Sequence, residues 1–129
     1  MTSLRLLPIL GLALLTGCAH SPDSLIVQKQ SQCPLHLSSG QLLMLTLPSN
    51  PTTGFRWVLN DGAETVLESL GPEVYSNPED AGLVGSAGLS TWRFNVKQAG
   101  TGHLRLAYQR PWETEVAPAK TFDCAIKAR

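Results

Sequence analysis

Apolar and polar residues alternate with a period of two along most of this chain, and this alternation restricts the chain to strand-rich folds. The clearest example is residues 91–96, Thr-Trp-Arg-Phe-Asn-Val, in which Trp92, Phe94 and Val96 share one face. The same period recurs in residues 43–47, 55–59, 104–108 and 122–126, and more weakly in residues 66–75, where Gly71-Pro72 interrupts it. No window shows a sustained helical period with caps, so we expect little helix.

Short strands separated by turn residues about every 8–12 positions predict an all-β protein. We expect an immunoglobulin-like β-sandwich of about seven to eight strands. Trp57 lies where such sandwiches place a tryptophan in the core. Leu45 and Leu106 occupy the strand centres that carry the inter-sheet cysteine pair in antibody domains, so this core must be held by packing.

The N-terminus has the features of a targeting segment. Arg5 is its single charge, and the apolar run at residues 6–15 is shorter than the roughly 20 residues that span a bilayer. Leu15-Thr16-Gly17-Cys18 then resembles a bacterial lipobox. We predict a lipoprotein signal peptide at residues 1–17 and a lipid on Cys18 that attaches the protein to a membrane; an ordinary signal peptide is the alternative. Ala19, where an aspartate would resemble an inner-membrane retention signal, favours an outer membrane lipoprotein that faces the periplasm.

The remaining chain is long enough for one domain with one core. Residues 18–32 are mostly polar and are expected to be a lipidated tether, with a short edge strand near residues 25–27 as an option, and residues 33–129 are expected to form the sandwich. Removing Arg5 from ten basic side chains, against ten acidic ones, leaves a formal charge of −1. Because there is no strongly basic patch, we do not expect nucleic acid as a partner. We expect a monomer with no cofactor and no metal.

Two further cysteines are predicted to point inward. Cys33 shares a face with Leu35 in the first strand of the expected domain, and Cys124 shares one with Ile126 in the last strand. The first and last strands of immunoglobulin-like sandwiches can lie side by side, so a disulfide closing a loop of about 90 residues is one interpretation. Two buried free thiols, which behave as small hydrophobic groups, are the other.

Three loops rich in glycine and proline are candidate binding segments, since loops on a rigid scaffold commonly carry function. The first is Asn50-Pro51-Thr52-Thr53-Gly54-Phe55. Pro51 fixes φ near −65°, the two threonines are stiff at χ1, and Gly54 allows a positive φ. This predicts a pre-organised protrusion with small side chains, whereas a plain strand connection would not explain two threonines at its tip.

The other two loops differ in stiffness. In Arg110-Pro111-Trp112, Pro111 ends the preceding strand and Trp112 stands among polar neighbours, which suits an interface anchor; a tryptophan folded back onto its own sandwich is the alternative. The middle loop, residues 77–88, is long and glycine-rich and contains Leu83, Val84 and Gly85. A segment of this kind is usually functional or simply flexible.

The first and third loops together, with Leu47-Pro48-Ser49 and Tyr108-Gln109 before them, resemble the chagasin family of papain-like cysteine protease inhibitors. The resemblance extends over about residues 35–127. In the middle loop, Gly85-Ser86-Ala87-Gly88 departs from the Gly-x-Gly-Gly pattern typical of the family.

The resemblance implies an immunoglobulin-like fold and a wedge of three loops that blocks the protease cleft. Residues 50–54 would lie over the catalytic cysteine and histidine of the protease, with Thr52 nearest. Residues 83–85 would run along one side of the cleft. Trp112 would stack on an aromatic wall on the other side, with Arg110 supporting it.

An enzyme is not expected from the titratable residues. His20 lies in the tether, and His36 and His103 alternate outward on strands, without an adjacent nucleophile and orienting acid. No His/Cys cluster has the spacing of a zinc site. The alternative function is an envelope lipoprotein whose β-sandwich is a non-inhibitory module for binding a protein or a wall component.

Overall fold

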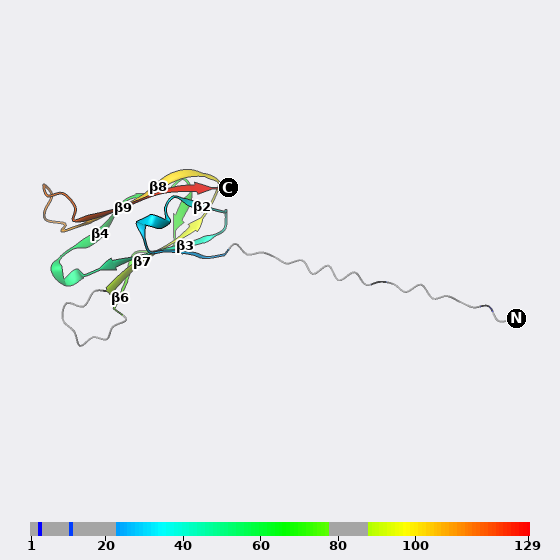
Figure 1. Cartoon of the computed structure of the whole chain (residues 1–129), viewed down its shortest axis with the longest axis horizontal. Coiled ribbons are helices and arrows are strands. Elements are labelled where there is room, and N and C mark those ends of the chain that lie inside the picture. Colours follow the sequence, from blue (N-terminus) through cyan, green and yellow to red (C-terminus); the bar gives the residue numbers. More distant parts are fainter. Residues whose placement is uncertain (1–2, 4–10, 12–22, 78–87) are drawn as a thin grey trace.

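The computed structural model describes residues 3, 11, 23–77 and 88–129. Over these residues the chain forms two β-sheets packed face to face, with two short 3-10 turns (Figure 1). The elements in chain order are β1 (Leu25–Val27), η1 (Gln30–Gln32), β2 (Leu35–Leu37), β3 (Leu42–Ser49), η2 (Pro51–Thr53), β4 (Arg56–Gly62), β5 (Leu67–Ser69), β6 (Val74–Ser76), β7 (Gly88–Val96), β8 (Gly100–Gln109) and β9 (Lys120–Ala128). Within the described ranges, no helix is long and apolar enough to cross a membrane.

The two sheets have different edges. One sheet has the strand order β1-β3-β7-β5, with β6 also pairing with β7, and the other has the order β2-β9-β8-β4. Most pairs are antiparallel, but β1 runs parallel to β3 and β2 runs parallel to β9. The expected immunoglobulin-like sandwich is confirmed, with nine strands in the described residues.

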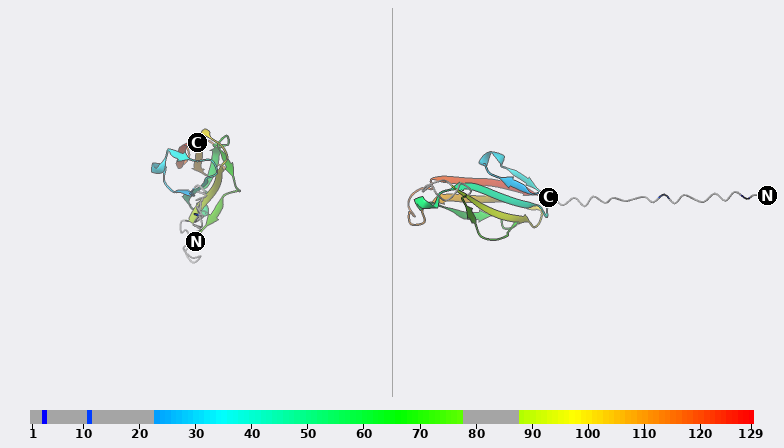
Figure 2. Two further views of the ribbon diagram at one scale, coloured as in Figure 1. Left: turned by 90° about the vertical axis from the view of Figure 1, so that its right-hand side faces the viewer. Right: turned by 90° about the horizontal axis from the view of Figure 1, so that it is seen from below.

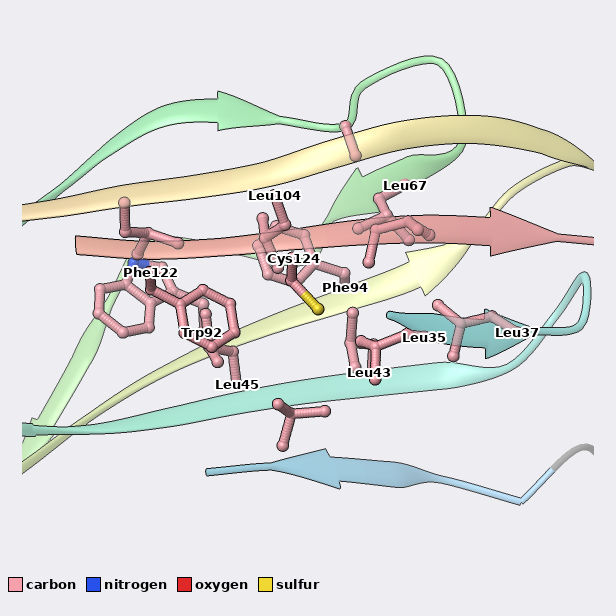
Figure 3. Packing of buried hydrophobic residues seen from close by; sticks show 14 of the residues in the cluster. Leu35, Leu37, Leu43, Leu45, Leu67, Trp92, Phe94, Leu104, Phe122 and Cys124 are labelled. Atoms are coloured by element: carbon pink, nitrogen blue, oxygen red, sulfur yellow. The ribbon is translucent and has the colours of Figure 1, made fainter. Parts of the chain in front are cut away.

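The core lies between the sheets and is built from the inward positions of the alternating segments (Figure 3). Successive side chains of a strand point to opposite faces, so every second residue of the long strands is buried. The buried set includes Leu43, Leu45, Leu47, Trp57, Trp92, Phe94, Val96, Leu104, Leu106, Tyr108, Phe122, Cys124 and Ile126. The inward faces expected from the sequence are confirmed at these positions.

Leu59 is an exception to this pattern. The sequence predicts that it faces inward with Trp57, yet its side chain is 40% exposed. The pairing of β4 with β8 shifts by one residue between Leu59 and Asp61, and β4 is the edge strand of its sheet. An irregularity of this kind bends the strand and redirects its side chains, which the sequence period does not reveal.

The weak strand expected over residues 66–75 is two strands in the structure. β5 pairs with the end of β7, where Leu67 lies opposite Val96, and β6 pairs with its beginning, where Val74 lies opposite Thr91. Gly71-Pro72 lies between them, as the interruption in the sequence pattern indicated. This split is one reason why the strand count exceeds seven to eight.

The start of the folded domain is a correction to the expected boundary at residue 33. Residues 25–32 belong to the sandwich, because β1 pairs with β3 and Val27 is only 1% exposed. The Gln30 side chain then bonds to both backbone groups of Asp123 in β9: its amide donates to the carbonyl oxygen and its oxygen accepts from the N–H at 2.9 Å. Gln30 thereby takes the place of a neighbouring strand beyond the short β2, a role that a polar tether sequence does not reveal.

Cys33 and Cys124 form a disulfide, with an S–S distance of 2.02 Å and Cα atoms 5.3 Å apart. Their elements are adjacent because β2 pairs with β9 in a register that places Leu35 opposite Ile126. Cys124 is fully buried, and Cys33 packs against the core from its edge.

The direction of the outer strands sets the two ends of the domain. β1 begins beside Leu43, near the start of β3, whereas the turn η2 follows the end of β3 at Ser49. β9 begins beside Tyr108 and ends at Ala128, beside Gly100. The first strand therefore starts, and the last strand ends, at the end of the sandwich opposite to η2 and the β8–β9 loop (Figures 1 and 2).

We expect loss of the disulfide to destabilise the domain strongly. It links positions 91 residues apart, for which the chain-entropy model gives about 4–5 kcal/mol. The double variant Cys33→Ala/Cys124→Ala should lower the free energy of unfolding by about 2–5 kcal/mol in urea denaturation. Reduced wild-type protein, which leaves no cavity, is the control; equal unfolding midpoints for oxidised and reduced protein would contradict the expectation.

Candidate functional site

The β3–β4 turn is closed by its own hydrogen bonds. The Asn50 side chain caps η2, where its oxygen accepts from the Thr52 N–H at 3.2 Å and from the Thr52 hydroxyl at 2.5 Å. The Thr53 hydroxyl donates to the Asn50 carbonyl at 2.7 Å, and the Gly54 N–H donates to the Pro51 carbonyl at 3.1 Å. Gly54 ends the turn with φ of 81°, a left-handed conformation that favours glycine. The expected pre-organised protrusion is thus present over residues 50–54.

A buried aromatic cluster anchors the start of this turn. The Tyr108 hydroxyl accepts a hydrogen bond from the Asn50 N–H at 2.9 Å. The Tyr108 ring packs between Phe55 and Trp57, with centroid distances of 5.2 Å and 4.9 Å. The Trp57 indole N–H donates to the Pro48 carbonyl at 3.0 Å. The backbone just before the turn is therefore bonded directly to side chains of the sandwich.

Arg110 joins the β8–β9 loop to the same turn. Its Nε donates to the Thr53 carbonyl at 3.1 Å, and its guanidinium carbon lies 4.5 Å from the centroid of the Phe55 ring. Its Nη1 donates to Glu113 Oε1 at 3.0 Å. In this structure Arg110 therefore supports the first loop, whereas the sequence resemblance implied support of Trp112.

Trp112 is the most exposed of the large hydrophobic residues described, at 67%. Its side chain is not part of the core. The edge of its indole nevertheless lies over Gly54, because a Cβ atom at Gly54 would overlap Trp112 Cη2. The two loops are therefore in direct contact, and glycine at position 54 is needed for space as well as for its positive φ.

The middle loop can be followed only at its base. Leu83, Val84 and Gly85 lie outside the described residues. At the start of β7, the Tyr75 ring covers Gly88 so closely that a Cβ atom there would overlap it. The Ser90 hydroxyl, fully buried, donates to the Glu73 carboxylate. These contacts join β6 to β7 below the loop.

Two of the hollows on the described surface differ in their relation to the loops. A small one of about 110 Å³ lies beside the β8–β9 loop, between Phe55, Arg110, Glu113 and Val116. A larger one of about 490 Å³ lies over β2, β9 and β8 and is lined by His36, His103 and Lys127 among others. It lies at the start of β8 and the end of β9, at the end of these strands away from the β8–β9 loop, so it does not belong to the same site.

The titratable side chains described do not form a catalytic arrangement around the loops. His36 and His103 are exposed, as expected from their alternation. His103 Nδ1 lies 3.1 Å from Asp123 Oδ1, and Arg105 Nε lies 3.3 Å from Oδ2. The hydrogen bond to His103, assisted by the charge of Arg105, lowers the pKa of the Asp123 carboxyl. Among the described residues, no group of three or more His, Cys, Asp or Glu side chains could hold a metal ion.

This immunoglobulin-like sandwich presents, at one end, two loops that contain proline and contact each other. Such an arrangement is typical of a scaffold for binding another protein. The family model described as "Chagasin family peptidase inhibitor I42" matches residues 36–126 of this chain. The chain belongs to this family.

One relative agrees with that assignment, and two solved structures share the fold. Chagasin from Trypanosoma cruzi is 34% identical over 105 residues, which cover 80% of this chain and 96% of chagasin. The crystal structure of the cysteine protease inhibitor EhICP2 from Entamoeba histolytica superposes with a TM-score of 0.72 at 23% identity, covering 83% of this chain and 96% of that one. The inhibitor PbICP-C, solved in complex with falcipain-2, gives a TM-score of 0.54 at 18% identity, covering 84% and 93%.

Two residues with a part in this geometry were not singled out as site residues from the sequence. The alternation of residues 104–108 predicts that Tyr108 faces the core but says nothing of its hydroxyl group. Glu113 follows Trp112 in a polar loop, where an acid is expected to be solvated. Its separation of three residues from Arg110, across a turn closed by the Glu113 N–H and the Arg110 carbonyl, is the signal that could have identified it.

We expect Gly54→Ala to separate the two loops. A Cβ atom at this position would be strained at φ of 81°, by about 1–2 kcal/mol, and would displace the Trp112 indole. Nuclear Overhauser contacts between the Trp112 ring and residue 54 should disappear, with a lower melting temperature. Gly71→Ala is the matched control, since φ is 148° there but nothing lies within 4 Å of the added carbon. Persistence of the ring contacts in Gly54→Ala would contradict the described packing.

Proposed function

We propose that the protein is a reversible, competitive inhibitor of papain-like cysteine proteases that blocks the active-site cleft with the loop end of its sandwich. Its membership of the chagasin family carries this proposal. The falcipain-2 complex of PbICP-C is an example of a structural neighbour bound to a protease. The coupling of residues 50–54 to the β8–β9 loop supports it further, because a rigid wedge loses little conformational entropy on binding.

The proposed roles of the loops follow from the side chains that they expose. In the first loop, Asn50 to Phe55, the exposed threonines at positions 52 and 53 are small side chains that fit a narrow cleft, with Thr52 nearest the catalytic cysteine and histidine of the protease. Trp112 provides a large exposed aromatic surface beside it, which is typical of an interface anchor. Leu83, Val84 and Gly85 of the middle loop are proposed to line the other side. With a formal charge near zero, shape and apolar contact rather than long-range attraction would select the partner.

We propose a binding role without catalysis by the inhibitor itself. The relatives reported above are protease inhibitors, and the exposed end of the sandwich offers threonines, a proline, a glycine and a tryptophan rather than an activated nucleophile. A reversible complex without a covalent bond to the protease follows from this chemistry. The loop peptide bonds should remain intact.

We expect stoichiometric inhibition of papain that is competitive with a small peptide substrate. Occupation of the cleft should raise the apparent KM without changing kcat. Steady-state kinetics at several inhibitor concentrations measure this, and mass spectrometry after long incubation should show an uncut chain. Trypsin, which has a different cleft, is the control protease and should remain active.

Trp112→Ala then tests the site. An interface aromatic typically contributes at least about 2 kcal/mol, so the inhibition constant should rise roughly 30-fold, more than for Thr52→Ala. Val116→Ala, which removes another exposed apolar side chain of the same loop, is the matched control.

A folded wild-type protein that leaves papain active would favour the alternative of a non-inhibitory envelope module. A cut between Asn50 and Phe55 that accompanies loss of inhibition would indicate a substrate-like mechanism.

We also propose that the protein is a lipoprotein of the outer membrane that faces the periplasm, attached through Cys18. The lipobox-like Leu15-Thr16-Gly17-Cys18 supports this; Cys18 and the signal segment at residues 1–17, apart from residues 3 and 11, lie outside the described residues. The Cys33–Cys124 disulfide is compatible with an oxidising compartment.

We expect Cys18→Ser to release a soluble and fully inhibitory protein from the membrane fraction. The thiol is the acceptor of the proposed lipid, and the folded domain begins several residues further along the chain. Fractionation of cells and an assay of papain inhibition in each fraction measure the outcome. Unchanged membrane association of the variant would contradict lipid attachment at Cys18.

A further inference from the structure

Glu113 lies next to the three-residue segment 110–112, and its carboxylate is turned back toward the sandwich. We propose that Glu113 is a positioning residue, which holds the Arg110 guanidinium against the Thr53 carbonyl and so fixes the β3–β4 turn before a protease binds. The expected effect of Glu113 on inhibition rests on the proposed function. The effect of Glu113 on the turn of the free protein can be measured without any protease.

The geometry shows how Glu113 can act through Arg110. The guanidinium has one contact on the turn, Nε to Thr53 O at 3.1 Å, and one on the Phe55 ring, 4.5 Å from its centroid. A single N–H···O bond and a ring contact leave the group free to pivot, because arginine has five N–H donors in a rigid fork. The bond from Nη1 to Glu113 Oε1 at 3.0 Å gives the fork a second fixed point.

Glu113 itself is held by the turn that it follows. Its backbone N–H donates to the Arg110 carbonyl at 3.0 Å, so its Cα position is fixed relative to Arg110. Its side chain is 30% exposed and that of Arg110 is 38% exposed. Together with Phe55 they line the hollow of about 110 Å³ beside the loop. The carboxylate is thus directed to Arg110.

The turn is attached to the sandwich at both of its ends. The Tyr108 hydroxyl holds its first residue through the Asn50 N–H, and Arg110 holds its fourth through the Thr53 carbonyl. Weakening the second attachment would let Thr53 and Gly54 move away from Trp112. Ordering them again on binding would then reduce the affinity.

Because the Arg110 and Glu113 side chains are partly exposed, their ion pair can position the turn without adding much to the free energy of unfolding. Ion pairs at the surface add little to the free energy of unfolding, because solvent screens them. We therefore expect Glu113→Gln and Glu113→Ala to leave the melting temperature nearly unchanged. The two variants should raise the inhibition constant for papain by about two- to fivefold, the range expected for a partly exposed ion pair, with the larger effect for alanine.

The direct experiment is amide hydrogen exchange in the free, full-length protein. In Glu113→Ala the N–H groups of Thr53 and Gly54, which bond to Asn50 and Pro51 within the turn, should exchange faster than in the wild type. Glu115→Ala is the matched control, an exposed acid of the same loop, and should leave these amides unchanged. Equal exchange at Thr53 and Gly54 in Glu113→Ala and the wild type would overturn the proposal.

A double-mutant cycle tests whether the effect passes through Arg110. In an Arg110→Ala background, Glu113→Ala should cause no further rise in the inhibition constant. An equal rise with and without Arg110 would mean that Glu113 contacts the protease directly, which overturns the positioning role. If the wild type does not inhibit papain, the proposed function fails, and the exchange measurements on the free protein still decide whether Glu113 positions the turn.

Discussion

The hydrogen bond between the Asn50 N–H and the Tyr108 hydroxyl is the link on which the loop end of this protein depends. Tyr108 is 8% exposed, and its ring packs against Trp57 in the core and against Phe55 at the rim. One side chain therefore belongs both to the hydrophobic core and to the turn above it. Arg110 extends this arrangement outward by lying on Phe55 and bonding to Thr53. The conformation of the exposed loops is therefore held by side chains that pack in the sandwich.

Two loops that are bonded to each other behave differently from two independent ones. Proline and a capping asparagine limit the conformations of residues 50–54, and the indole of Trp112 covers the glycine at their end. A displacement of either loop must break contacts to the other. The pair can therefore be expected to open as a unit, and substitutions in one loop should be non-additive with substitutions in the other.

The sequence predicted the sandwich because a strand with one buried face carries an apolar residue at every second position, as in Trp92, Phe94 and Val96. It predicted the first and third loops from their proline, glycine and exposed tryptophan. It offered β1 only as an optional edge strand, since three apolar residues in a polar segment are too few for a period. It failed at Leu59, since a shift in strand pairing has no signature in composition. The contact of Arg110 with Thr53 joins residues whose neighbourhood is set by the β4–β8 pairing, so it could be seen only in the fold.

The parallel pairing of β1 with β3 gives the molecule a polarity along its long axis. The chain enters the sandwich at one pole, and the turn at Asn50 emerges at the other. The lipid proposed on Cys18 would thus be attached on the side of the pole opposite to the loops, and the two poles are separated by about the length of an eight-residue strand, about 25 Å. A protease bound at the loops would be held clear of the lipid surface. A membrane-anchored inhibitor of this build could intercept enzymes diffusing through the surrounding compartment without first being shed.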